Sequence, residues 1–561
     1  MASRYLITSA LLYANGVIHF GHLAGAFLPS DSFARFKRLM GEDVLYISGS
    51  DEYGFAITMS AEAANRSPRE HVDYYHEINK KLFDKLGISF DHYSRTTWEG
   101  HKQPVQQFFL DLLANGYIEE KETEQLYSEQ DKKFLADRYV TGICPVCKKD
   151  GARGDECPHC GASFEATDLL SPRSKATGSP LTLKLTKHWF LRFDLFKDKL
   201  LKWLSLKHWK PNVVNFVEGY IRDLKPRAIT RDSDWGIKIP LENTDGKVLY
   251  VWFDAPIGYI SATMQWAQLI GEPRAWERYW LQDDTKLVHF IGKDNIPFHT
   301  IFFPAMCMGQ NTPYKLVDEV PANEFLNLEG KQFSKSAGWT IDMEEFLEDF
   351  SADQIRYTLS ANAPENADAE FTWNDFQMRC NAELVGKFGN LVNRTLVFAK
   401  KHCEQKVPER GQLEEIDQNF LKAIREIVHK AELAYEQFSL RKASLAFMEL
   451  ASLGNVYFDT KKPWVDAKLE TTHERMKTTI SCCLECLQSL ALISLPMIPT
   501  AALELFKMLG STSDLKDIRW KQLKPLQVGQ LLEEPKILFK KVEDEIIAAQ
   551  LAKLHAMSAN A

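Results

Sequence analysis

The sequence lacks a long apolar run and an excess of basic residues. Of its 561 residues, 45% are hydrophobic and 26% are charged, and the formal net charge is −8. The longest apolar stretches, such as Leu490 to Met497, are far shorter than the about 20 residues of a membrane-spanning helix. These absences argue against a membrane protein and against a generally basic nucleic-acid binder. A local basic surface is still compatible with them, because binding depends on where charge lies.

The N-terminus also lacks the apolar core of a secretory signal, because four polar or charged residues interrupt it: Ser3, Arg4, Thr8 and Ser9. We therefore expect a cytoplasmic protein with no membrane association, in which thiols stay reduced. Six of the ten cysteines are scattered, which is typical of small buried apolar residues; they are Cys307, Cys380, Cys403, Cys482, Cys483 and Cys486.

No internal repeat or low-complexity segment is present, and the chain is too long for one hydrophobic core, so two to four domains are expected. Near the N-terminus, Tyr5 to Ile7 predicts a strand, Gly21 to Met40 a helix, and Val44 to Ile47 a second strand. Strand, helix and strand in this order open a parallel α/β sheet.

A second unit of this kind lies downstream. Leu287 to Ile291 predicts a strand, Gly292 to Asp294 a loop, and the stretch to Met308 a helix. The residues between the two units differ in character, with a cysteine cluster, many glycines and several prolines. We expect a nucleotide-binding sheet that is interrupted by an inserted domain. From about Glu383 onward, apolar residues recur at helical spacing, which predicts an all-helical domain.

The first motif is His19-Phe20-Gly21-His22, directly before the first helix. A helix N-terminus presents free N–H groups and a partial positive charge, which suits phosphate. Two imidazoles add hydrogen-bond donors there, and Gly21 lets the backbone approach a ligand. Taken alone, the two histidines could also be a chance pair, or a metal pair that lacks a carboxylate partner.

The second motif is Lys331-Gln332-Phe333-Ser334-Lys335-Ser336, which follows Gly330. A loop with two lysines can close over a triphosphate and neutralise the charge that develops during transfer. Taken alone, it could also be a solvated basic loop.

A third motif combines two close cysteine pairs, Cys144 with Cys147 and Cys157 with Cys160. Four thiolates at this spacing can surround Zn²⁺ tetrahedrally, and a site closed by four protein ligands is structural and not catalytic. The alternative is a redox dithiol pair. His159 lies inside the second pair and is a weaker candidate ligand.

The first two motifs together resemble the two signature motifs of class I aminoacyl-tRNA synthetases. Their order, their separation in the sequence and their place in an interrupted sheet all match that family. The resemblance implies that His19, His22 and Lys335 stabilise charge during catalysis, together with Arg231. It also implies an ATP site formed by His19, Gly21, His22, Gly292, Asp294, Lys331, Ser334 and Lys335, with Mg²⁺ on the ATP phosphates. Phe20 and Phe333 depart from the family pattern, at positions that we expect to pack and not to contact ligand.

Within this class, the segments at 10–16, 230–236, 251–259 and 292–299 resemble methionyl-tRNA synthetases. A thioether packs well against aromatic rings, and these segments are rich in them. The implied methionine site comprises Leu11, Tyr13, Asp51, Trp252, Ala255, Pro256, Tyr259, Asn295 and His299, with Asp51 holding the ammonium group. Arg231 is the implied partner of the substrate carboxylate and of Asp294. Plain core packing is the alternative role of each aromatic residue, and Leu12 and Tyr53 depart from the family pattern.

In the helical domain, two segments at 388–394 and 455–464 resemble the family's anticodon-reading elements. Splayed RNA bases are read by stacking and by hydrogen bonds to their edges. The implied contacts are Asn390, Arg394 and Trp464, although Trp464 could instead pack between helices. Lys461 and Lys462 could hold phosphates.

The implied activity is methionine–tRNA ligase, which activates L-methionine with ATP and transfers it to tRNA(Met) for translation initiation and elongation. The expected fold is α/β, and five segments are predicted: 1–99, the first half of a Rossmann-type catalytic domain; 100–251, an inserted zinc-bearing connective domain; 252–323, the second half; 324–385, a linker domain with the lysine–serine motif; and 386–561, the anticodon-binding helices.

The chain has no room for the large editing domain that near-isosteric substrates require, and a monomer is expected. Two alternative functions remain at this stage. A cysteine-specific synthetase would place zinc at its amino-acid site, whereas these four cysteines form a closed set. A non-catalytic tRNA-binding paralogue would be expected to lose one of the phosphate motifs.

Overall fold

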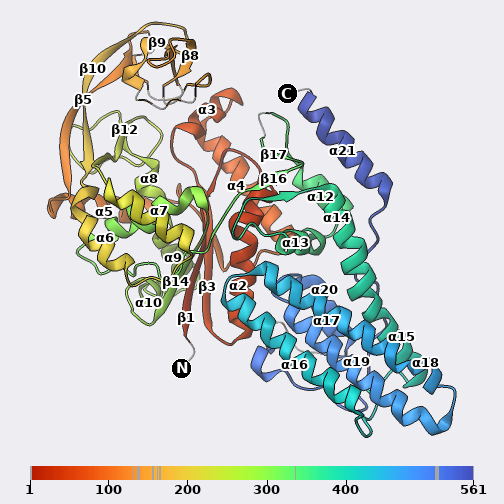
Figure 1. Cartoon of the computed structure of the whole chain (residues 1–561). Helices are drawn as coiled ribbons and strands as arrows, with labels where there is room; N and C mark the ends of the chain where they lie inside the picture. Colours follow the sequence, from red (N-terminus) through yellow and green to blue (C-terminus); the bar gives the residue numbers. More distant parts are fainter. Residues whose placement is uncertain are drawn as a thin grey trace.

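The computed structural model describes residues 3–130, 132–135, 139–154, 157–160, 162, 164, 166–334, 337–511 and 517–559. A central sheet lies between the inserted domain, drawn in orange and yellow at the upper left of Figure 1, and a helical domain, drawn in teal and blue at the lower right. The last helix, α21, returns from the helical domain toward the upper part of the molecule.

The central sheet is parallel and has the order β15-β14-β1-β3-β2, with β4 paired to β3. Its strands are β1 (Arg4–Ser9), β2 (Leu12–Tyr13), β3 (Asp43–Asp51), β4 (His92–Arg95), β14 (Thr285–Gly292) and β15 (Ala322–Asn323). Leu6 of β1 pairs with Leu45 of β3 on one side and with Leu287 of β14 on the other. Two segments far apart in the sequence therefore form one sheet, as the interrupted-sheet hypothesis predicts.

The first predicted helix is confirmed as an almost continuous helical stretch. It consists of α1 (Phe20–His22), the π-helical turn η1 (Leu23–Phe27) and α2 (Leu28–Leu39). After β14, the second unit continues through η7 (Lys293–Asn295), η8 (Phe298–Phe302) and α11 (Phe303–Met308). In both units a helix follows the carboxyl end of a strand, where parallel sheets bind their ligands.

Between strands β3 and β14, the chain forms β4, a set of helices and a long hairpin. The helices are α3 (Phe55–Ala63), α4 (Pro68–Lys85), α5 (Lys102–Ala114), α6 (Lys197–Leu204), α7 (Pro211–Arg222), α8 (Val251–Asp254), α9 (Gly258–Leu269) and α10 (Glu277–Trp280). Strand β5 (Ile118–Ser128) pairs antiparallel with β10 (Leu181–Leu191) and leads to a small sheet of β7 (Val140–Ile143), β8 (Asp150–Arg153) and β9 (Leu170–Ser174). That small sheet, at the top of Figure 1, holds the cysteine cluster.

A linking region follows the second half. It contains β16 (Leu326–Leu328), β17 (Lys331–Gln332), β18 (Ala369–Phe371), α12 (Met343–Asp349), α13 (Ala352–Ala361) and α14 (Trp373–Met378). The helical domain then comprises η9 (Arg379–Gly389), α15 (Asn390–His402), α16 (Glu415–Glu436), α17 (Leu440–Lys461), α18 (Pro463–Asp466), α19 (His473–Ser494), α20 (Pro499–Met508) and α21 (Asp544–Ala559).

One apolar core runs from the central sheet into the helical domain. It includes Phe36 of α2, Tyr435 of α16 and Leu487 of α19. The six scattered cysteines are all buried, as predicted. Among the described helices, none combines the length and the apolar character that a membrane crossing requires.

Candidate active site

The two phosphate motifs meet at one place in the fold. The rings of His19 and Phe333 are stacked, with centroids 4.7 Å apart and an interplanar angle of 2°. Phe20 is fully buried and also faces Phe333, at 6.4 Å. The expectation that both phenylalanines pack is therefore confirmed. This packing holds the second motif against the start of the first helix.

The first motif forms a compact cap at the start of α1. The Gly21 N–H donates to His19 Nδ1 at 3.1 Å, and the His19 N–H donates to His22 Nδ1 at 3.2 Å. The two imidazole centroids lie 3.8 Å apart. A Cβ at Gly21 would lie 2.9 Å from His19 Cε1, so no larger residue fits there without moving the imidazole.

The described part of the second motif is a short hairpin. Ser334 pairs with Trp339 in an antiparallel bridge, and the Lys331 ammonium lies 4.3 Å from the centroid of the Trp339 ring. Lys335, the predicted catalytic lysine, and Ser336 lie outside the described residues.

Gly292 and Asp294 lie at the carboxyl end of β14, where a nucleotide would approach the sheet. A Cβ at Gly292 would lie 2.8 Å from Asp294 Oδ1, so glycine keeps this carboxylate close to the backbone. Between them, Lys293 is paired with Glu324 at 2.8 Å and with Asp368 at 2.7 Å. Those pairs anchor the loop to the linking region.

The predicted methionine-site aromatics come together from α8, α9 and η8. Trp252 stacks on Phe298 with centroids 3.9 Å apart, and Tyr259 Oη lies 2.8 Å from His299 Nε2. Ala255 and Pro256 are buried beside them on η6 (Ala255–Ile257). Leu11 reaches the same wall, because a Cβ at Gly258 would lie 2.9 Å from Leu11 Cδ1.

The tautomer of His299 follows from its two contacts. Its Nδ1 lies 3.0 Å from the Asn295 carbonyl oxygen, which can only accept, so Nδ1 carries the proton. Burial lowers the pKa of His299 to about 4, so the ring is neutral near pH 7. The Tyr259 hydroxyl therefore donates to Nε2, which fixes both rings in the wall of the site.

Asp51 ends β3 next to Tyr13, its partner in the β2–β3 register. The carboxylate is buried, and burial together with the charge of Asp254 raises its pKa. Its neighbour Glu52 accepts from Arg95 Nε at 2.8 Å, which anchors the end of the strand. Asp51 thus lies at the carboxyl end of β3, and its contact with the substrate ammonium stays a prediction.

The predicted pair between Arg231 and Asp294 is not formed. The Arg231 guanidinium instead lies 3.8 Å from the Tyr250 ring centroid and donates to the carbonyl oxygens of Ala228 and Thr230. Arginine stacks readily on aromatic faces, and these contacts hold it on strand β12 (Thr230–Asp232).

The four clustered cysteines form a metal site. Their sulfur atoms all lie within 4.8 Å of one another, with Cys144 and Cys160 at 3.8 Å and Cys147 and Cys157 at 3.6 Å. A tetrahedron with Zn–S bonds of about 2.3 Å has edges of about 3.8 Å. Backbone N–H groups of Val146, Cys147 and His159 point at the sulfur atoms. The arrangement fits a structural zinc ion, as predicted.

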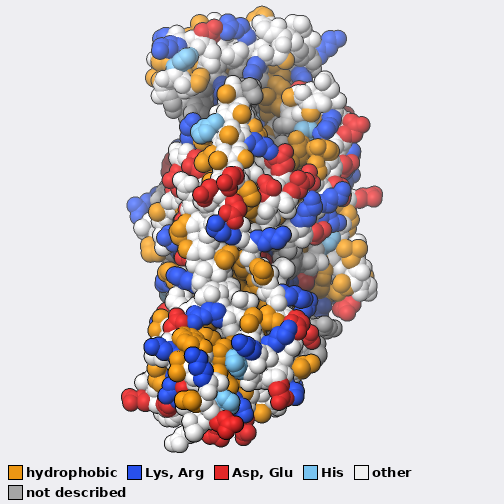
Figure 2. Space-filling view, turned by 90° about the vertical axis from the view of Figure 1, so that its right-hand side faces the viewer, with side chains coloured by type: hydrophobic (Ala, Val, Ile, Leu, Met, Phe, Trp, Pro, Cys, Tyr) orange, Lys and Arg blue, Asp and Glu red, His pale blue; other side chains and the backbone are white. Residues whose placement is uncertain are grey.

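The three anticodon candidates lie on adjacent helices. Asn390 donates to Asn455 at 3.1 Å, and Arg394 pairs with Asp459 at 2.5 Å while lying over the Phe458 ring. Trp464 is 39% exposed, so part of its ring is open to solvent. Figure 2 draws one face of the molecule. At its lower end, where the helical domain lies, hydrophobic side chains are bordered by Lys and Arg.

Lys461 does not hold a phosphate in this fold, contrary to the prediction. Its side chain is only 3% exposed and pairs with Glu414 at 2.8 Å and with Asp417 at 2.9 Å. Lys462 follows it with a positive φ of 49° and ends α17.

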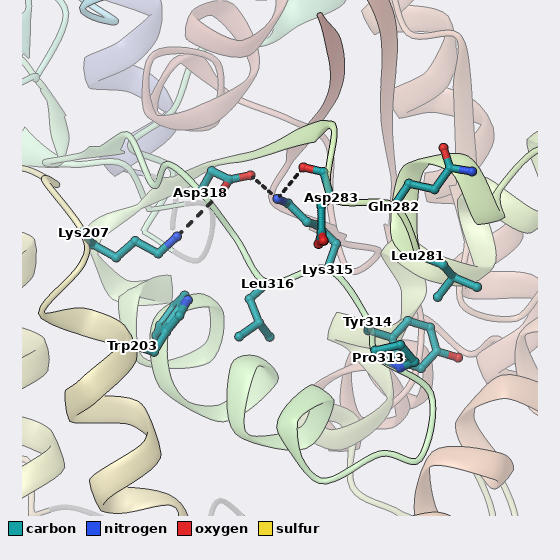
Figure 3. Close-up of a pocket in the computed structure, with 10 residues that line it drawn as sticks. All are labelled: Trp203, Lys207, Leu281, Gln282, Asp283, Pro313, Tyr314, Lys315, Leu316 and Asp318. Carbon is teal, nitrogen blue, oxygen red and sulfur yellow. Dashed lines mark hydrogen bonds and ion pairs between the residues drawn. The ribbon is translucent and has the colours of Figure 1, made fainter.

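A cavity of about 280 Å³ lies away from this site, between α6 and the segments that precede β14 and β15 (Figure 3). It contains Lys207 and Lys315, but both pair with Asp318, at 3.8 and 3.3 Å. It lies at the amino end of β14, opposite the edge that carries the motifs, so it is not part of the nucleotide site.

Sequence reasoning missed three residues that shape the site. Phe298 forms the stack on Trp252, Trp235 Nε1 donates to the Glu52 carbonyl oxygen at 2.8 Å, and Asp254 is a fully buried carboxylate. Asp254 carried a usable signal, because it is an acidic residue inside an apolar and aromatic run.

Comparison with known proteins gives a consistent result. A family model described as class I tRNA synthetases (M) matches residues 5–396, and one described as the anticodon binding domain of methionyl tRNA ligase matches residues 407–558. The methionine–tRNA ligase of Protochlamydia amoebophila strain UWE25 is 61% identical over 560 residues, which are 100% of this chain and 80% of that protein. The ligase of Chlamydia trachomatis serovar A is 51% identical, over 97% of this chain and 100% of that one.

Among solved structures, Mycobacterium tuberculosis methionyl-tRNA synthetase in complex with methionyl-adenylate superposes with a TM-score of 0.80 at 26% identity, covering 96% of this chain and 99% of that chain. The two motifs that meet at His19 and Phe333, the aromatic wall and the four-cysteine site all lie within residues 5–396, which the synthetase family model matches. The chain therefore belongs to the methionyl-tRNA synthetase family.

Proposed function

We propose that this protein is a methionine–tRNA ligase that activates L-methionine with ATP and transfers it to tRNA(Met). In the first step a carboxylate oxygen of methionine attacks the α-phosphorus of ATP, the bond from this phosphorus to the α,β-bridging oxygen breaks, and pyrophosphate leaves. Mg²⁺, when bound, would neutralise charge on the phosphates. In the second step the 3′-terminal ribose hydroxyl of the tRNA attacks the methionyl carbonyl, and AMP leaves.

The contact between His19 and Phe333 carries the proposal. It joins a helix start that suits phosphate to a hairpin that carries lysines, at the carboxyl edge of a parallel sheet. A triphosphate bound there meets His19, His22 and Lys331, with Lys335 in the same motif. Charge that builds on the phosphates is neutralised without any covalent nucleophile.

The pocket beside this site selects methionine. Trp252, Tyr259 and Leu11 offer apolar contacts to the thioether, and Asp51 receives the ammonium group. Because His299 is neutral and already accepts from Tyr259, it shapes the pocket and does not pair with the substrate carboxylate.

The helical domain reads the anticodon through Asn390, Arg394 and Trp464. One chain holds both phosphate motifs, the amino-acid pocket and these helices, so we further propose that it acts as a monomer. The four thiols of the zinc site require reducing conditions, which fits a cytoplasmic enzyme.

Charging of tRNA tests the proposal. The enzyme is incubated with radiolabelled methionine, ATP and either a tRNA(Met) transcript or the same transcript with a changed anticodon. We expect charging of the first and a loss of at least a hundredfold with the second. Charging of neither transcript, with ATP consumption absent as well, would contradict the ligase function.

A further inference from the structure

Two buried carboxylates beside the methionine pocket have oxygen atoms without a hydrogen-bond donor. Within the described residues, they are Oδ1 of Asp51 and both side-chain oxygens of Asp254. Oε1 of the adjacent Glu52 also lacks a donor, but Glu52 has a counter-ion, because its Oε2 pairs with Arg95 at 2.8 Å. Asp51 is 4% exposed and Asp254 is fully buried. A buried anion that lacks donors and a counter-ion costs several kcal/mol, so such a pair requires an explanation.

The two carboxylates come from different elements and lie close enough for the charge of Asp254 to act on Asp51. Asp51 ends β3, whereas Asp254 ends α8 between Trp252 and Ala255. The two elements meet at Gly54, where a Cβ would lie 2.6 Å from Tyr13 Oη and 3.1 Å from Val251 Cγ1. Burial raises the pKa of both carboxyl groups, and the charge of Asp254 raises the pKa of Asp51 further.

Within the described part of the chain, no lysine or arginine forms an ion pair with Asp254, and His101 is its one basic neighbour at ion-pair distance. His101 Nε2 lies 3.5 Å from Asp254 Oδ2, but burial lowers the pKa of His101 to about 3, so the ring is neutral. Its Nδ1 lies 2.7 Å from Ser261 Oγ. Tyr13 and Tyr53 face the pair as neutral phenols, since burial raises the pKa of each, and the Tyr13 hydroxyl donates to the Tyr53 carbonyl oxygen.

Arg231, the cation predicted to lie at the amino-acid site, is engaged elsewhere, over the ring of Tyr250 and with two backbone carbonyls. Two neighbouring buried carboxylates that lack a cation disfavour double ionisation, and this favours a state in which the pair holds one proton. An ammonium group carries one positive charge and three N–H donors, which match the unpartnered oxygens.

We propose that Asp254 is a second substrate-binding carboxylate, which forms with Asp51 an acid pair that receives the ammonium group of methionine and releases its shared proton on binding. This inference rests on the proposed function and adds a residue to the amino-acid site. Asp254 thereby selects for a free α-ammonium group, because a ligand without it would leave the acid pair protonated and the oxygens unpaired.

The proposal fixes the direction of a pH dependence. While the free pair holds a proton that the complex does not, methionine affinity rises with pH, by at most tenfold per unit. Above the apparent pKa of the free pair, the affinity becomes flat. The measurement stays between pH 5.5 and 7, where the amino group of free methionine is charged.

The test is calorimetric titration of the full chain with L-methionine in two buffers of different ionisation enthalpy, which counts the protons released. We expect release of up to one proton by the wild type and none by Asp254→Asn, whose affinity falls at least tenfold. Asp223→Asn is the matched control, since this aspartate is 82% exposed and lies away from the site; it should match the wild type.

A ligand pair separates direct contact from a structural role. The desamino analogue 4-(methylsulfanyl)butanoate should bind wild type and Asp254→Asn with affinities within twofold of each other, without proton release. Equal losses for both ligands would assign Asp254 a merely structural role and overturn the proposal.

If Asp254→Asn does not fold, measurements on the wild type alone still test the acid pair. Methionine binding without proton release between pH 5.5 and 7 would overturn the acid pair and leave the ligase function intact. Absence of methionine binding and of methionine-dependent ATP–pyrophosphate exchange would overturn both.

Discussion

Phe333 joins the two phosphate motifs by stacking on the His19 ring. An aromatic pair of this kind contributes about 0.5–1.5 kcal/mol beyond its buried area. We predict that Phe333→Ala lowers the kcat of methionine-dependent ATP–pyrophosphate exchange by roughly 2- to 13-fold. The KM for methionine should stay within twofold, because the ring lies outside the amino-acid pocket.

Phe216→Ala is the control for this change, since Phe216 is a 43% exposed phenylalanine on α7. It should leave kcat unchanged. A Phe333→Ala enzyme with full kcat would show that the stack does not position the hairpin for catalysis.

Residue identities in the site were predictable, but their partners were not. The resemblance of segment 455–464 to an anticodon-reading element suggested that Lys461 holds a phosphate. Its buried ammonium instead pairs with Asp417 of α16 and with Glu414, the residue before that helix. Arg231 was matched to Asp294, yet Tyr250, which directly follows β13 (Lys247–Leu249), stacks on it instead. Both errors have one cause, because a side chain's charge partner depends on which elements pack beside it.

At the scale of elements, the zinc-bearing sheet has little core of its own. Its buried apolar cluster contains Leu126, Leu135, Val140, Ala152, Leu169 and Leu181, besides two of the cysteines. A core of this size does not hold a sheet without a metal or a cross-link.

We therefore predict that one zinc ion per chain is bound and that its removal unfolds only this element. A strong chelator should make residues 139–175 sensitive to protease. The thermal midpoint of the rest of the chain, measured without methionine, should shift by less than about 2 °C. Cys147→Ser should reproduce the chelated state, and Cys403→Ala, a buried cysteine outside the cluster, should not. Retained protection without zinc would contradict a structural role.

Trp464 offers the exposed aromatic surface among the anticodon candidates. Stacking of a base on an aromatic side chain is worth about 1–3 kcal/mol. We predict that Trp464→Ala raises the KM for tRNA by roughly 5- to 150-fold in aminoacylation and leaves ATP–pyrophosphate exchange unchanged.

The comparison variant is Leu445→Ala, which removes a 69% exposed apolar side chain from the first half of α17. It should not alter the KM for tRNA. An unchanged KM in Trp464→Ala would assign Trp464 to helix packing against Phe458, whose ring lies 6.0 Å away.

The elements themselves were largely predictable. The strands at 5–7, 44–47 and 287–291 and the first helix were all found within a few residues of their observed bounds. The register of Leu6 with Leu287 was not, because pairing across an inserted domain leaves no periodic signal in the sequence.

At the scale of the whole molecule, Arg356 of α13 ties three regions together. Its fully buried guanidinium donates to Asp31 of α2 at 2.6 Å, to the Leu86 carbonyl oxygen at 3.2 Å and to the Met497 carbonyl oxygen at 2.8 Å. The catalytic sheet, the linking region and the helical domain therefore share one polar junction inside a common core.

Loss of this junction should weaken the whole chain. Removing one partner of a buried ion pair costs about 3–5 kcal/mol. We predict that Arg356→Ala lowers the thermal midpoint by several degrees and separates unfolding of the helical domain from that of the sheet. Arg274→Ala, at an arginine that is 86% exposed, is the control. A single transition at the wild-type midpoint would show that the apolar core alone holds the domains together.

The central claim is that this chain binds methionine in the pocket beside the phosphate motifs and activates it with ATP. The most direct measurement is ATP–pyrophosphate exchange with each of the twenty amino acids, without tRNA. The predicted result is exchange with methionine at least a hundredfold above every other amino acid. Exchange with a different amino acid would contradict the assignment of Trp252, Tyr259 and Asp51 to a methionine site, and exchange with none would contradict activation by this chain.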